Sequence, residues 1–70
     1  MERVPVSSSV LSAVGYDAET QTLEVEYSRG GIYQYKDVPL EVFDQLMEAT
    51  SKGTFINDHV KDSYAFIRLS

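Results

Sequence analysis

Two tyrosines separated by one residue, Tyr33 and Tyr35, are the side chains whose type and spacing best fit a binding function. Aromatic rings on a β-sheet can stack on unpaired nucleobases, and cations beside them can neutralise phosphates. Arg29 and Lys36 flank the pair in the sequence and would supply that positive charge. The same two rings can instead belong to the core, with their hydroxyl groups at the margin of the sheet. The face of the sheet that the rings occupy therefore decides between two interpretations.

A second candidate site is the segment Ser51-Lys52-Gly53-Thr54 together with Asn57. Free backbone N–H groups at the start of a helix attract anions, and Lys52 and Lys61 would add positive charge. The segment lacks the preceding glycine, the strand and the length of a phosphate-binding loop, so that motif is not indicated. The alternative is structural, because Ser51 and Asn57 can hydrogen-bond to backbone groups of the loop.

Side chains for catalysis do not occur at diagnostic spacings. The one histidine, His59, follows Asp58 without the nucleophile that a general base needs or the companion ligands that a metal needs. The chain has no cysteine, and its acidic residues do not follow a calcium-loop pattern. We therefore expect a protein that is not an enzyme and that has no metal and no cofactor.

Length and charge narrow the classes of function. Seventy residues, 43% hydrophobic and 24% charged, fit one small domain over residues 1–70. Six basic and eleven acidic residues give a net charge of −5, which repels nucleic acid unless a local basic patch exists. No apolar run is long enough to span a membrane, and the N-terminus lacks the apolar core of a signal peptide. We expect a cytoplasmic protein with no membrane partner.

Hydrophobic periodicity predicts the elements that position these side chains. Alternating patterns predict three strands near residues 10–16, 22–28 and 32–36. A helical period begins at Pro39 and ends at Lys52-Gly53, and a shorter helix capped by Thr54 ends near Lys61. Residues 64–69 are an extended tail or a fourth strand. The order predicts an α+β fold, with two helices on one face of a three-stranded antiparallel sheet.

The turn before Tyr33 decides which face the tyrosines occupy. A three-residue turn, Arg29 to Gly31, pairs Tyr27 with Tyr33 and Val25 with Tyr35, and places both rings under the helices. A two-residue turn, Gly30-Gly31, slips the pairing by one residue and moves both rings to the open face. The alternation of apolar residues favours the three-residue turn.

A four-residue turn over residues 18–21 pairs Val14 with Val25 and leaves Leu11 on the open face beside Ala13. With Ile32 nearby, these residues would form a modest apolar patch. The open sheet face or a free strand edge is therefore an alternative site, for a protein partner or for a homo-oligomer.

A series of short motifs extends through nearly the whole chain. They are Ser9, Gly15-Tyr16-Asp17, Leu23-Glu24-Val25, Tyr33-Gln34-Tyr35, Val38-Pro39, Ala49-Thr50-Ser51-Lys52-Gly53, Phe55-Ile56-Asn57, Val60-Lys61-Asp62 and Tyr64. In this order they resemble the KTSC domain over about residues 6–66. That family takes its name from the C-terminus of some lysyl-tRNA synthetases and also occurs as stand-alone bacterial and phage proteins of this length.

The resemblance implies a single KTSC-like domain, and the synthetase context implies RNA as a partner. It places the Tyr-x-Tyr positions at Tyr33 and Tyr35. We therefore predict a small non-catalytic binding module, with a protein–protein interaction domain as the alternative. The candidate site residues are Tyr33, Tyr35, Arg29, Lys36, Ser51, Lys52, Gly53 and Asn57.

Overall fold

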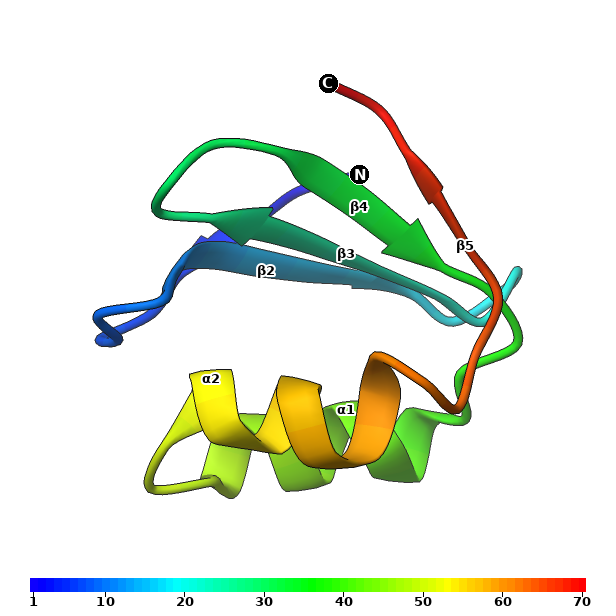
Figure 1. The fold of residues 1–70 in the computed structure, drawn as a ribbon. Helices are drawn as coiled ribbons and strands as arrows, with labels where there is room; N and C mark the ends of the chain where they lie inside the picture. Colours follow the sequence, from blue (N-terminus) through cyan, green and yellow to red (C-terminus); the bar gives the residue numbers. More distant parts are fainter.

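A computed structural model describes residues 1–70. A five-stranded antiparallel sheet forms one layer, and the helical segments form a second layer across one of its faces (Figure 1). The strands lie in the sheet in chain order, from β1 to β5. The elements are β1 (Val4–Pro5), β2 (Leu11–Asp17), β3 (Thr22–Tyr27), β4 (Ile32–Tyr35), α1 (Leu40–Glu48), α2 (Lys52–Phe55), the π-helical turn η1 (Ile56–Val60) and β5 (Phe66–Arg68). None of the helices has the length and apolar character needed to cross a membrane.

The α+β class and the helices on one face of the sheet agree with the prediction, but the sheet has five strands rather than three. The short strand β1 pairs with β2 through Val4 opposite Val14, and Pro5 fits an edge strand because it has no N–H to donate. The tail forms the fourth strand that the sequence left open, since β5 pairs with β4 through Phe66 opposite Tyr35. Both added strands therefore lie at the edges of the predicted sheet.

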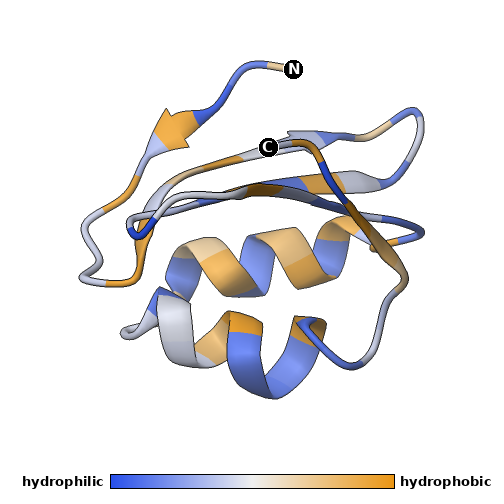
Figure 2. Cartoon of the chain, turned by 45° about the horizontal axis from the view of Figure 1, so that its top comes forward, coloured by the Kyte–Doolittle hydropathy of each residue, from blue (hydrophilic) through white to orange (hydrophobic).

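The core lies between the sheet and the helices. Apolar residues alternate along β3, and polar and apolar residues alternate along both helical segments (Figure 2). Leu46 is the one fully buried residue of α1, and the half-buried Val42, Phe43 and Met47 pack beside it. The buried core consists of Leu11, Val14, Leu23, Val25, Tyr35, Val38, Leu46, Ile56 and Val60.

The prediction that Leu11 lies on the open face is wrong. Val14 does pair with Val25 as predicted, but the pairing of β2 with β3 shifts between Leu11 and Ala13. Such a bulge adds one residue to one strand and reverses the alternation beyond it. Leu11 therefore turns into the core, where its exposure is 0%, and the predicted apolar patch does not form.

The tyrosines of β4 face the helices, as the three-residue turn predicted, but their partners differ by two residues. Val25 pairs with Tyr33 rather than with Tyr35. The N–H of Tyr27 donates to the carbonyl of Gly31 at 3.0 Å, so the loop consists of residues 28–30. A shift by two residues keeps every side chain on its predicted face.

The junction between the helices also differs from the prediction. The first helix ends at Glu48, and Gly53 lies inside α2 instead of ending α1. Ser51, not Thr54, is the N-cap, because its Oγ accepts a hydrogen bond from the N–H of Thr54 at 3.4 Å. A Cβ on Gly53 would lie 2.8 Å from the Cβ of Val10, so a close contact between segments explains this glycine.

Candidate functional site: an aromatic pocket with a charged mouth

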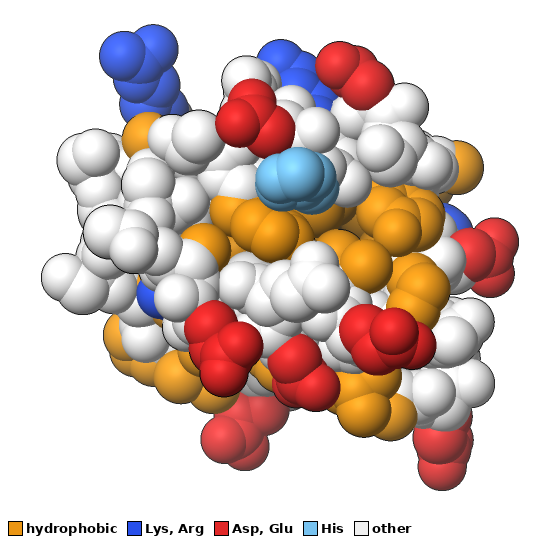
Figure 3. All heavy atoms as spheres, turned by 90° about the horizontal axis from the view of Figure 1, so that it is seen from below, with side chains coloured by type: hydrophobic (Ala, Val, Ile, Leu, Met, Phe, Trp, Pro, Cys, Tyr) orange, Lys and Arg blue, Asp and Glu red, His pale blue; other side chains and the backbone are white.

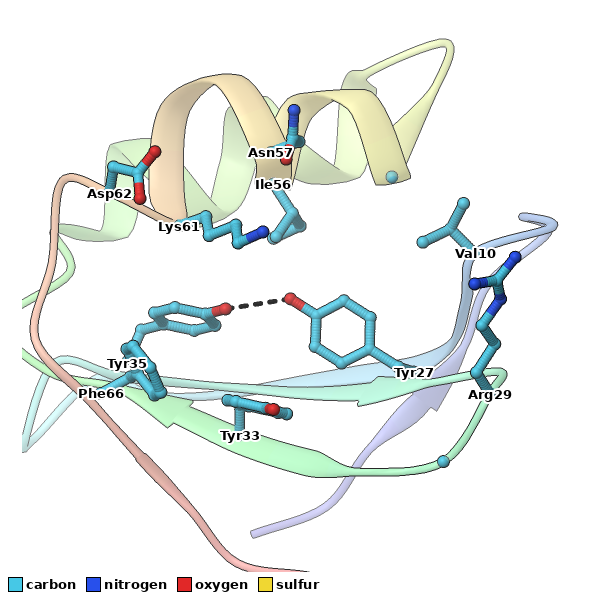
Figure 4. Close-up of a pocket in the computed structure, with 12 residues that line it drawn as sticks. Val10, Tyr27, Arg29, Tyr33, Tyr35, Ile56, Asn57, Lys61, Asp62 and Phe66 are labelled. Carbon is cyan, nitrogen blue, oxygen red and sulfur yellow. Dashed lines mark hydrogen bonds between the residues drawn. The ribbon is translucent and has the colours of Figure 1, made fainter.

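A pocket of about 650 Å³ opens between the sheet and the α2–η1 segment (Figure 4). Tyr27, Tyr33 and Tyr35 line it from the sheet, and Gly53 and Ile56 line it from the helical layer. Two further apolar walls come from the loop before β2 and from β5, through Val10 and Phe66 respectively. Polar side chains at its mouth are Arg29, Asn57, Lys61 and Asp62, and we call these four residues the polar rim.

The three tyrosines of the pocket differ in how much of each ring is available. Tyr35 is 2% exposed and belongs to the core, whereas Tyr27 and Tyr33 are half-buried. The rings of Tyr27 and Tyr33 are edge-to-face, with centroids 5.4 Å apart and planes at 88°. Phe66 packs 5.4 Å from Tyr33 and 5.6 Å from Tyr35, measured between ring centroids. Tyr33 and Tyr35 therefore do not form a two-ring stacking surface open to solvent.

The hydroxyl groups of Tyr27 and Tyr35 are hydrogen-bonded to each other, with 2.9 Å between the oxygens (Figure 4). Burial raises the pKa of Tyr35 above its ordinary value, and the hydrogen bond to Tyr27 and the nearby charge of Asp62 raise it further. The hydroxyl of Tyr35 is therefore protonated throughout the neutral range and keeps its bond to Tyr27.

No side chain of the polar rim forms an ion pair or a hydrogen bond within the chain. Four of the six cations are engaged elsewhere: Arg3 lies 3.2 Å from Glu24, and the ammonium or guanidinium groups of Lys36, Lys52 and Arg68 donate to oxygens at 3.2, 3.1 and 2.9 Å. The two cations left without an ion pair or a side-chain hydrogen bond are Arg29 and Lys61. Both lie at the mouth of the aromatic pocket.

The structure brings five of the eight predicted site residues together at this pocket, and places three elsewhere. The five are Tyr33, Tyr35, Arg29, Gly53 and Asn57. Lys36 lies on the opposite face of the sheet, where its ammonium donates to Gln34, because side chains alternate along β4. A site that combines Lys36 with the tyrosine rings is therefore geometrically excluded.

Ser51 and Lys52 have structural contacts of their own. The Oγ of Ser51 accepts from the backbone of Thr54, and the Nζ of Lys52 donates to the carbonyl of Ala49. These contacts correspond to the structural alternative for Ser51. They leave neither side chain directed at the pocket.

Sequence reasoning did not assign several residues of the pocket to a tyrosine site. Tyr27 shares the helix-facing side of the sheet with Tyr33, so the alternation of β3 carried a signal for it. No pattern in the sequence pointed to Phe66, because its position beside the tyrosines depends on the pairing of β5 with β4. Lys61 and Asp62 reach the pocket only because η1 places the end of the helical layer over Tyr35 (Figure 4).

The open face of the sheet is polar and internally paired. Glu24 is 5% exposed, accepts a hydrogen bond from Gln34 at 2.9 Å and pairs with Arg3. The outer surface of the helical layer is also polar, and Figure 3 shows acidic side chains spread over it around apolar patches. Glu41, Asp44 and Glu48 of α1 are exposed. The two cations that have neither an ion pair nor a side-chain hydrogen bond, Arg29 and Lys61, thus both lie at the mouth of the pocket.

Comparison with known proteins agrees with the resemblance seen in the sequence. A model of the KTSC domain matches residues 7–64. The crystal structure of a KTSC domain protein from Yersinia pestis has a TM-score of 0.96 to this chain at 35% identity, and the match covers 99% of this chain and 97% of that one.

Two relatives show the contexts in which similar sequences occur. An uncharacterized protein of Stutzerimonas stutzeri is 47% identical over 64 residues, which are 91% of this chain and 90% of that protein. A lysine–tRNA ligase of Nostoc punctiforme is 39% identical over 62 residues, which are 89% of this chain and 11% of the ligase. Since the family model and the solved structure match most of its length, the chain belongs to the KTSC domain family.

Proposed function

We propose that this KTSC domain is a non-catalytic module of the cytoplasm that binds single-stranded RNA at the aromatic pocket. The observation that carries the proposal is the position of Arg29 and Lys61, the two cations without internal partners, at the mouth of a pocket lined by tyrosines. Aromatic rings next to free cations are the combination by which proteins hold unpaired bases and their phosphates. The similarity to part of a lysine–tRNA ligase, an enzyme that acts on tRNA by its name, supports RNA as the ligand class.

The charge of the chain limits how RNA can bind. A net charge of −5 opposes unselective attraction to phosphates, so affinity must come from the pocket and from two local cations. Two cations neutralise at most two phosphates, so the logarithmic salt slope on a single strand is no steeper than about −1.4, and a fourfold rise in salt weakens binding by at most roughly sevenfold. This shallow salt dependence distinguishes the proposed mode from binding to an extended basic surface.

The test measures the anisotropy of a labelled unstructured RNA with the double variant Arg29→Ala/Lys61→Ala. Its matched control is Lys36→Ala/Lys52→Ala, which changes the net charge equally but removes no cation of the pocket. We expect the first variant to lose about tenfold in affinity and the control to change less than about twofold. Equal losses in both variants, with folding verified by circular dichroism, would refute the site.

A protein partner at the outer edge of β5 is the second candidate function. This strand lies at the edge of the sheet, and its Ile67 and neighbouring Leu69 are 48% and 50% exposed. A free edge can pair with another strand, including that of a second copy. Sedimentation over a wide range of concentrations tests the second copy, and a protein that stays monomeric throughout contradicts a homo-oligomer.

A further inference from the structure

The shape of the pocket and the order of charges along its rim carry an inference that rests on the proposed function. We propose that the pocket takes up one unpaired nucleobase at a time and that Lys61 and Asp62 select guanine. The proposal concerns the ligand of the aromatic pocket and not a second site.

The arrangement of the rings indicates one base rather than a run of stacked bases. Tyr27 and Tyr33 stand at 88° to each other, so a flat base that stacks on one ring cannot stack on the other. Tyr35 offers no free ring face, because it is 2% exposed. A volume of about 650 Å³ lies within the range of small-ligand pockets and has room for a single nucleotide.

Ile56 closes the pocket opposite the tyrosines: it is 2% exposed, comes from η1 and faces the hydroxyl groups of Tyr27 and Tyr35 (Figure 4). The more exposed apolar lining comes from Val10 and Phe66, which are 47% and 50% exposed. The hydrogen bond between the hydroxyl groups of Tyr27 and Tyr35 uses one of their two protons. In the proposed complex the base is held by apolar contact, and its edge is directed at the polar rim.

The two ends of the pocket differ in charge. Asp62 lies at one end beside Lys61, and Arg29 lies at the other end beside Val10 (Figure 4). A carboxylate only accepts hydrogen bonds, and ammonium and guanidinium groups only donate them. Arg29 therefore suits the phosphate of a nucleotide whose base edge is directed at Lys61 and Asp62.

Lys61 and Asp62 line the same end of the pocket without forming an ion pair, and together they complement guanine better than the other bases. Guanine presents the acceptor O6 beside two donors, N1–H and N2–H, so Lys61 can donate to O6 while Asp62 accepts from both N–H groups. Uracil presents one N–H between two carbonyls and fits less well. Adenine and cytosine direct an unprotonated ring nitrogen toward the carboxylate, which leaves two acceptors facing each other.

The test titrates the folded protein with guanosine, uridine, adenosine and cytidine 5′-monophosphates and follows the Ile56 methyl and Tyr33 ring signals by NMR. We expect guanosine monophosphate to bind about fivefold or more tightly than adenosine monophosphate. Asp62→Asn should remove most of this preference while leaving adenosine monophosphate binding in place. The matched control is Asp58→Asn, which removes an exposed charge of η1 that does not line the pocket.

The outcomes separate the inference from the proposed function. If RNA binding depends on Arg29 and Lys61 but all four mononucleotides bind equally, guanine selection is refuted and the proposed function stands. If the mononucleotides leave the Ile56 and Tyr33 signals unmoved while RNA binds, uptake of a base into the pocket is refuted as well. If neither RNA nor mononucleotides bind, the proposed function fails together with the inference.

Discussion

Replacing Gly53 by alanine sets two effects of known size against each other. Inside a helix this change is ordinarily favourable by about 1 kcal/mol, because alanine is the better helix former. Here the new Cβ would lie 2.8 Å from the Cβ and 2.9 Å from the Cγ2 of Val10. Valine is β-branched and stiff, so relief requires a shift of the backbone, and such overpacking costs about 1–3 kcal/mol. We therefore expect Gly53→Ala to lower the free energy of unfolding by about 1 kcal/mol.

A double-mutant cycle with Val10→Gly isolates the contact between the two residues. This second change deletes the three atoms that a Cβ on Gly53 would meet, and Val10 is 47% exposed. In that background Gly53→Ala should become stabilising by up to about 1 kcal/mol, which is its ordinary effect in a helix. The cycle should thus give a coupling free energy of about 1–3 kcal/mol between the two positions. Urea unfolding measures it, provided that the slope with denaturant is the same in all four proteins.

Gly30 provides the control for this cycle. A Cβ there would meet no atom within 4 Å, but its φ of 103° disfavours any other residue. Gly30→Ala should therefore cost about 1–2 kcal/mol of backbone strain, by the same amount with and without Val10. If the effects of Gly53→Ala and Val10→Gly simply add, the packing of α2 against the loop before β2 is not as the structure places it.

Three further changes test the core and the tyrosines. Tyr16→Phe removes the hydroxyl that donates to the carbonyl of the buried Val38, so thermal unfolding should show a loss of about 1–2 kcal/mol, and an unchanged midpoint would contradict the bond. Because the native pKa of Tyr35 is raised, its contribution to stability is complete below its unfolded pKa of about 10 and is lost as pH rises further. Tyr27→Phe removes one cause of the raised pKa of Tyr35, so the free energy of unfolding should fall less between neutral and high pH than in the parent protein. Ultraviolet titration of the tyrosines, together with unfolding at several pH values, measures this difference. Leu46→Ala should cost about 2–5 kcal/mol in urea, whereas a cost below about 1 kcal/mol would place this side chain outside the core.

Local patterns in the sequence predicted the central part of the fold. Strict alternation over residues 22–27 identified β3 and its buried face, and the loop over residues 18–21 gave the pairing of Val14 with Val25. The face of Tyr33 and Tyr35 also followed from alternation, even though their partners in β3 were misplaced by two residues. The face of the sheet that a side chain occupies is easier to predict than its partner on the next strand, because a shift of two residues keeps the face and changes the partner.

Features that depend on contacts between distant segments escaped prediction. The bulge that buries Leu11 leaves no sign in the alternation of β2, because Ala13 and Gly15 are small enough for either face. The pairing of Val4 and Pro5 with β2 is two residues long, which is too short for a periodic signal. Likewise, Ser51 and Thr54 are both suitable N-caps, and the helix begins after Ser51, with Gly53 packed closely against Val10.

In the candidate site, too, features set by local alternation were predictable, and features set by the packing of distant segments were not. Alternation along β4 already separates Lys36 from Tyr33 and Tyr35, so that error was avoidable from the sequence. Lys61, by contrast, approaches the tyrosines because the helical layer crosses the sheet, which no local pattern reports.

The negative charge of the chain has a consequence for selectivity under the proposed function. Acidic side chains are exposed on α1 (Figure 3). On the open face Arg3 pairs with Glu24, and the ammonium of Lys36 is hydrogen-bonded to Gln34, so both cations are engaged within the chain. The free cations Arg29 and Lys61 both lie beside the tyrosine pocket. An anion without a flat apolar part gains little there against the overall repulsion, whereas a nucleotide gains the burial of its base as well. Net acidity and a local pair of cations therefore favour ligands that combine phosphate with an aromatic ring over duplex RNA, whose bases are not free to enter.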